Sequence, residues 1–121
     1  MKKTLIVLGM LALMACTQTL DLQLEPEVSV YRSDDRENPK TLTAANAEYG
    51  IFNTWLRENQ SKWHPTKGRF KGGIFIQSGK KGIQITTSEV ILYANRGGRM
   101  EATHAAQIGP NELQSLKDFG K

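Results

Sequence analysis

Hydrophobic and polar residues alternate along several short stretches of the chain, a pattern typical of β-strands that bury one face. Turn residues rich in Gly, Asn and Lys separate these stretches. The alternation predicts strands over residues 27–32, 73–78, 83–88, 89–95 and 100–108. Gly79-Lys80-Lys81-Gly82 and Arg96-Gly97-Gly98-Arg99 are predicted as the turns of an antiparallel meander.

A helical pattern replaces the alternation between residues 44 and 60. Ala45, Tyr49, Phe52 and Leu56 recur at spacings of 4, 3 and 4, with Ile51 and Trp55 widening the same face. Thr43 is the expected N-cap. Residues 33–42 are polar, contain Asn38-Pro39 and are predicted to form a loop.

These elements together predict an α+β fold. One main helix packs on a curved antiparallel sheet of about four strands. A short C-terminal helix opens near Pro110, buries Leu113, Leu116 and Phe119, and ends at Gly120. The prediction places this single small domain over residues 27–121.

The start of the chain has a different pattern. Lys2 and Lys3 precede an apolar run over residues 5–14. A membrane-spanning helix needs roughly 20 apolar residues, so this run is too short to be a stable anchor. We interpret residues 1–15 as a secretory signal peptide that is removed from the mature protein.

The end of that run, Leu13-Met14-Ala15-Cys16, resembles the lipobox of bacterial lipoproteins. The family usually has a small residue where Met14 stands. The resemblance implies cleavage before Cys16, a diacylglyceryl group on its sulfur, and fatty acid such as palmitate on the new N-terminus. Two or more acyl chains hold a protein stably on a membrane. Residues 16–26 would then be the lipidated N-terminus and a tether.

In that family the residue after the cysteine influences sorting between membranes. Thr17 stands here, where aspartate would favour the inner membrane. The resemblance therefore implies the outer membrane, on its periplasmic side, with the inner membrane as the alternative. A cleavage elsewhere, which would discard Cys16, also remains open.

Charge is unevenly distributed along the chain, whose formal net charge is +4. Residues 62–99 hold eight Lys or Arg residues and one acidic residue, Glu89. Such a region can attract an anionic partner. The alternative is that these side chains are solvated and keep strand edges from aggregating.

The candidate binding surface combines this charge with an aromatic residue at the end of the predicted helix. Its members are Trp63, Arg69, Lys71, Lys80 and Lys81. The expected partners are an envelope protein, an anionic lipid or wall polymer, and the membrane itself through Cys16; nucleic acid is not expected. The aromatic residues could instead form the helix face that packs on the sheet.

Motifs for chemistry are absent from the sequence. His64 and His104 have no further ligands at a metal-site spacing. The chain has no G-x-S-x-G motif and no phosphate-binding loop. We therefore expect no metal, no cofactor and no enzymatic activity, although a hydrolase with a dispersed site stays open. The predicted function is a protein-binding, inhibitor or accessory module of the envelope, or alternatively a lipoprotein that binds lipid or cell-wall fragments.

Overall fold

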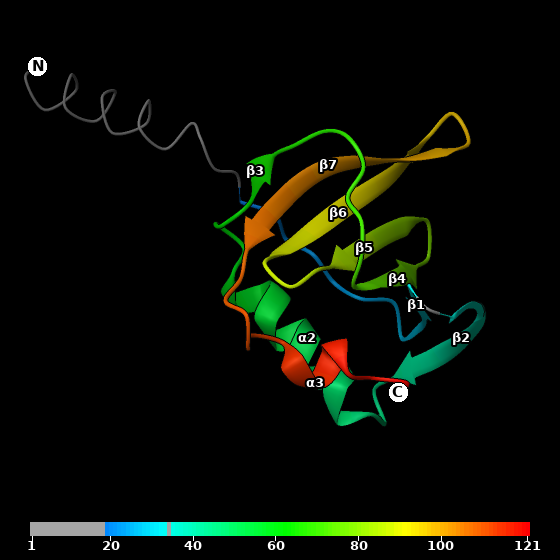
Figure 1. Ribbon diagram of the computed structural model, residues 1–121. Helices are drawn as coiled ribbons and strands as arrows, with labels where there is room; N and C mark the ends of the chain where they lie inside the picture. The colour runs from blue at the N-terminus through cyan, green and yellow to red at the C-terminus, as the bar shows by residue number, and fades with distance from the viewer. Residues whose placement is uncertain (1–18, 34) are drawn as a thin grey trace, which may run out of the picture.

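The computed structural model describes residues 19–33 and 35–121. Within these residues the chain forms a seven-stranded antiparallel sheet in the order β2-β1-β4-β5-β6-β7-β3 (Figure 1). The strands are β1 (Glu27–Arg32), β2 (Asp35–Thr43), β3 (His64–Pro65), β4 (Ile74–Ser78), β5 (Lys81–Ile85), β6 (Glu89–Arg96) and β7 (Arg99–Gln107). Two helices, α2 (Ala47–Glu58) and α3 (Gln114–Lys117), pack on one side of it. We call that side the helix face and the other side the open face.

The predicted fold class, one main helix on a sheet of about four strands, is wrong. The sheet has seven strands, and the two described helices have only 12 and 4 residues. The difference arises because β1 joins the same sheet as the meander, and because β2 and β3 come from segments without a strand-like apolar pattern. The strand predicted over residues 27–32 is confirmed.

Strand β2 replaces the loop predicted for residues 33–42. It lies at the edge of the sheet, where proline is tolerated because the outer backbone groups need no partner. Its register with β1 is broken between Val30, which pairs with Lys40, and Arg32, which pairs with Asp35. Pro39 lies inside that break, so the ladder loses no regular hydrogen bond to it.

The β4–β5 turn is shorter than predicted. Ser78 pairs with Lys81, so the turn consists of Gly79 and Lys80 rather than four residues, and β5 begins two residues early. Gly79 has φ +61° at the first turn position, as a type II′ turn requires. The predicted turn after β6 is confirmed, since Arg96 pairs with Arg99 across Gly97-Gly98.

Helix α2 begins at Ala47, three residues after the predicted start, and Asn46 is its N-cap instead of Thr43. The buried side chains of α2 are Phe52, Trp55 and Leu56. Ile51, expected on the buried face, is 44% exposed. The 3.6-residue period of the helix places Ile51 and the buried side chains on different sides, and the buried side faces the sheet.

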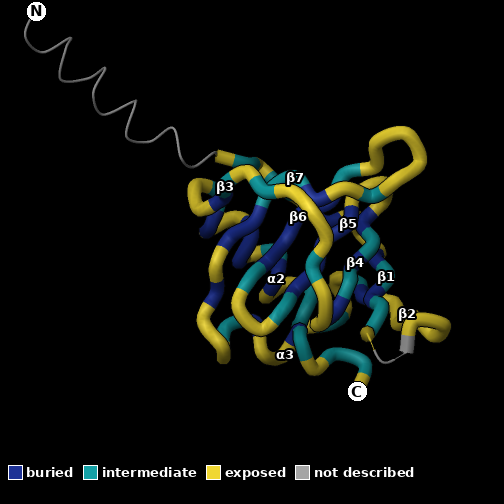
Figure 2. The backbone as a smooth tube through the Cα atoms, turned by 45° about the horizontal axis from the view of Figure 1, so that its top comes forward, coloured by how far each residue is buried: buried dark blue, intermediate teal, exposed yellow. Residues whose placement is uncertain are grey.

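The main core lies between the helix face and the helices. Alternate residues of the central strands supply one side of it, namely Ile74, Ile76, Ile83, Ile85, Val90 and Leu92. Figure 2 shows buried positions concentrated along these strands and exposed positions in the connecting loops and the β6–β7 tip. Each fully buried side chain of this size contributes about 1.5–3 kcal/mol.

The segment expected to be a tether packs on the domain. Leu24 is buried, and Leu20 and Leu22 pack against the core. The amide of Leu20 donates to the carbonyl of Gln60 at 2.8 Å. The Tyr49 hydroxyl donates to the carbonyl of Glu25 at 2.9 Å. The folded unit therefore begins several residues before β1, while Cys16 and the predicted signal peptide lie outside the described residues.

Candidate functional site

A groove of about 560 Å³ lies on the open face of the sheet. Segment 66–73 connects β3 to β4 and passes over this face (Figure 1). Its residues 69–73 line the groove and form one wall. We call this groove on the open face the basic groove. Its described lining residues are Tyr31, Arg32, Ser33, Arg36, Arg69, Phe70, Lys71, Gly72, Gly73, Ile74, Phe75, Gln77, Gln84, Tyr93, Arg99 and Met100.

The floor of the basic groove is apolar and aromatic. The rings of Phe75 and Tyr93 have centroids 5.6 Å apart with their planes at 53°. Gly82 lies beneath them on β5, where a Cβ atom would come within 2.4 Å of Phe75 Cζ and 2.6 Å of Met100 Cε. The missing side chain at Gly82 thus lets Phe75 and Met100 lie down over the centre of the sheet.

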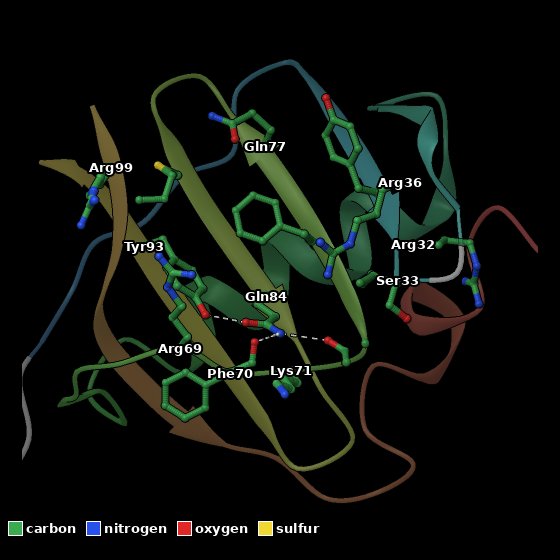
Figure 3. A pocket seen from close by; sticks show the side chains of 16 residues that line it. Arg32, Ser33, Arg36, Arg69, Phe70, Lys71, Gln77, Gln84, Tyr93 and Arg99 are labelled. Atoms are coloured by element: carbon green, nitrogen blue, oxygen red, sulfur yellow. Dashed lines mark hydrogen bonds between the residues drawn. The ribbon is translucent and has the colours of Figure 1, made fainter. Parts of the chain in front are cut away.

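Gln84 attaches the wall of the groove to its floor. Its Nε2 donates to the carbonyls of Phe70 and Gly72, at 3.0 and 2.9 Å. Its Oε1 accepts from the Tyr93 hydroxyl at 2.5 Å. Gln84 and Tyr93 are both buried, so this network is shielded from water and holds segment 70–72 in one position (Figure 3).

Burial raises the pKa of the Tyr93 phenol, and a hydrogen bond from the backbone of Phe70 opposes that rise. The phenol therefore stays protonated at physiological pH, and its proton is committed to Gln84. Because the Gln84 amide and the Tyr93 phenol are hydrogen-bonded to each other, they have a structural role rather than a reactive one.

The described lining of the groove contains five cationic side chains and no acidic one. Arg32 is committed elsewhere, because its Nη1 donates to the carbonyls of Lys117 and Phe119 at the end of α3. Figure 3 shows Arg32 directed away from the groove and Arg36 directed over the sheet. Arg36, Arg69, Lys71 and Arg99 are exposed and have no hydrogen-bond or ion-pair partner among the described residues. These four are the groove cations.

The structure brings together two members of the predicted binding surface and separates the other three. Arg69 and Lys71 lie on the wall of the basic groove. Lys80 lies in the β4–β5 turn, and Lys81 lines a small apolar cavity of about 170 Å³ beside Leu20 and Leu22. These two lysines therefore belong to a different part of the surface.

The prediction that Trp63 lies on the surface is wrong. Trp63 is fully buried, with its ring 5.8 Å from that of Trp55 in a T-shaped arrangement. Its Nε1–H has no hydrogen-bond partner among the described residues. The chain turns into β3 directly after this residue, and the indole fills the space between α2 and the sheet.

Several groove residues were not predicted from the sequence. Phe75 has the parity opposite to Ile74 and Ile76, which places it on the open face. Tyr93 lies on that face too, in one cluster with Phe75 and with Ile91, which has the same parity as Tyr93. Arg99 belongs to the basic region but was assigned only to a turn. Arg36 lies in an acidic stretch of sequence and reaches the groove only because β1 pairs with β4.

Metal-binding geometry is not found in the part of the chain that the structure describes, where no three His, Cys, Asp or Glu side chains cluster. His64 and His104 lie on the paired strands β3 and β7. Burial lowers the pKa of His104, and the nearby charge of His64 lowers it further. Among the same described residues, no helix has the length and apolarity needed to cross a bilayer.

Comparisons with known proteins assign no relative to this chain. No protein-family model matches it, and neither the curated proteins nor the solved structures contain a match. The interpretation of the basic groove therefore depends on its own geometry and chemistry.

Proposed function

We propose that this protein is a lipid-anchored binding module of the bacterial cell envelope, without enzymatic activity. It would be held through Cys16 on the periplasmic side of the outer membrane, and it would inhibit or assist an envelope protein. The observation that carries the binding role is the basic groove, where four cations with no partner among the described residues lie at the ends and along one side of an aromatic floor.

This arrangement favours an anionic partner. Among the described lining residues the groove has cations and no acidic side chain. Like charges gathered in this way raise the local positive potential and speed the encounter with a negative surface. Arg36, Arg69 and Arg99 supply planar guanidinium groups, which bind carboxylates with two parallel hydrogen bonds. The apolar floor adds area that is removed from water when a partner docks.

In-cell crosslinking of the tagged, lipidated protein tests this proposal. The variant Arg36→Glu/Arg69→Glu/Arg99→Glu reverses three groove cations. The matched control Arg57→Glu/Lys62→Glu/Lys80→Glu makes the same charge change at exposed positions outside the groove. We expect one dominant captured protein in the wild type and the control, and its loss in the groove variant. Equal capture by all three forms would overturn the assignment of the groove.

A ligand-binding role for lipid or cell-wall fragments is the second candidate. The volume of the groove, about 560 Å³, falls in the range of small-molecule sites, roughly 300–1,000 Å³. Phosphatidylglycerol vesicles and solubilised wall fragments are suitable probes. Saturable binding of either one, lost in the groove variant and kept in the control, would favour this candidate over a protein partner.

A further inference from the structure

The basic groove runs across the strands. Its floor residues come from β1, β4, β5, β6 and β7, which are consecutive neighbours in the sheet. Neighbouring strands lie about 4.8 Å apart, so the groove is about 19 Å long. A site of this length and volume accommodates a narrow, extended ligand better than a compact one.

Charge and apolarity are arranged in order along this length. Arg36 lies at the end formed by β1 and β2, and Arg99 lies at the opposite end, where β7 begins (Figure 3). Phe75 and Tyr93 occupy the middle. Arg69 and Lys71 flank the middle from the wall that Gln84 holds in place. The groove is therefore positive at its ends and along one side, and aromatic at its centre.

We propose that the basic groove binds an extended acidic segment of a partner protein. This inference rests on the proposed function and specifies which kind of segment of the partner the groove recognises. An extended chain rises about 3.3 Å per residue, so about six residues fill the groove. An apolar side chain of the segment would lie on Phe75, and Asp or Glu residues on either side of it would meet the groove cations.

The hydrogen bonding of the floor distinguishes this occupant from a sugar. Gln84 uses both ends of its amide within the protein. Gln77 also donates to the carbonyl of Gly79, at 2.7 Å. The amide of Gln84 is thus engaged at both ends and the NH2 group of Gln77 has a partner within the protein, and the centre of the floor presents mainly ring and thioether surface. An apolar side chain matches that surface.

The depth of the floor distinguishes the occupant from a bilayer. In the floor Tyr93 is buried and Phe75 is half-buried, and Phe70 in the wall is half-buried as well. A flat lipid surface reaches the groove cations at the rim but not this floor. An extended peptide segment reaches both at once.

Fluorescence anisotropy of a labelled hexapeptide tests the inference. The probe has Phe at its third position and Glu at the other five, and a control peptide has Ser in place of Phe. The protein is the full chain carrying Cys16→Ser. We expect saturable binding of the Phe peptide and roughly tenfold weaker binding of the Ser peptide. Raising the salt concentration should weaken both.

Matched variants locate the binding site. Arg36→Gln/Arg99→Gln removes one cation from each end of the groove and should lower the affinity for the Phe peptide roughly tenfold. Arg57→Gln/Lys80→Gln removes two exposed cations elsewhere and should leave its affinity unchanged. Circular dichroism melts of all forms confirm that each variant is folded.

The failures of the two proposals are distinguishable. If neither peptide binds, or if Arg36→Gln/Arg99→Gln has no effect, the acidic-segment inference is overturned. If capture in cells still depends on the groove cations, the proposed function survives that result. Binding of phosphatidylglycerol vesicles or wall fragments in place of the peptide would also overturn the inference, and would favour the second candidate function.

Discussion

Trp63 is a fully buried side chain whose indole N–H lacks a partner among the described residues. An unsatisfied buried donor costs about 1–3 kcal/mol. Trp63→Phe removes this donor and keeps a ring, so we expect the free energy of unfolding to change by less than about 1.5 kcal/mol. Trp63→Ala should cost about 3–5 kcal/mol, because it also leaves a cavity. Denaturant unfolding of the two variants checks this, and equal losses would show that the ring does not fill the core as described.

Gln84 is the residue on which the shape of the basic groove depends. Gln84→Met keeps a similar volume but leaves the Tyr93 hydroxyl and the carbonyls of Phe70 and Gly72 without this partner. We expect a loss of about 2–3 kcal/mol in the free energy of unfolding. The control Gln77→Met removes one bond from a half-exposed side chain and should cost less than about 1 kcal/mol. Similar values for both variants in urea unfolding would contradict the role given to Gln84.

Gly73 at the entrance to β4 fixes the end of the groove wall. It has φ +72°, and a Cβ atom there would lie 1.8 Å from the carbonyl oxygen of Ile85. Gly97 in the β6–β7 turn has φ +63° but open space around it. Gly97→Ala should therefore cost only the strain of the left-handed conformation, about 1–2 kcal/mol. Gly73→Ala adds a backbone clash, so its melting temperature should lie well below that of Gly97→Ala. The reverse order would contradict the described path of the chain.

The strands of the meander were predictable because apolar residues fall at alternate positions or in short β-rich runs, whether one face is buried, as in β4, or both are, as in β6. In β4 the alternation of Ile74 and Ile76 with polar or aromatic neighbours indicates a strand without any knowledge of its partners. Strand β2 has no such alternation, since Leu42 is its one buried residue among those described. Its conformation comes from pairing with β1, and a local pattern does not encode that pairing.

The candidate site was predictable only in part for the same reason. Arg69 and Lys71 could be identified because they are close together in a basic, Gly-rich segment. Arg36 and Phe75 are far apart in the sequence, and the β1–β4 pairing is what brings them to one groove. Trp63 was assigned to the surface because the helix ends near it, but the chain packs back on the core at that point.

The whole molecule sits close to the membrane if Cys16 carries lipid. The chain is already packed on the domain at Leu20, so the four intervening peptide units span at most about 14 Å. We expect the wild type to sediment with membranes and to incorporate labelled palmitate, and Cys16→Ser to do neither. Met14→Ala keeps the cysteine and should behave as the wild type does. Membrane association of Cys16→Ser with undiminished labelling would remove the lipoprotein interpretation.

Site-specific photocrosslinking in cells tests most directly whether the open face is the binding face. A photoreactive amino acid at Gln77 lies in the basic groove, and one at Ile51 lies on the exposed side of α2, across the sheet. We predict that one envelope protein is captured from position 77 and not from position 51, and that Arg36→Gln/Arg99→Gln abolishes the capture. Capture of the same protein from position 51 alone, or equally from both positions, would contradict the assignment of function to the groove.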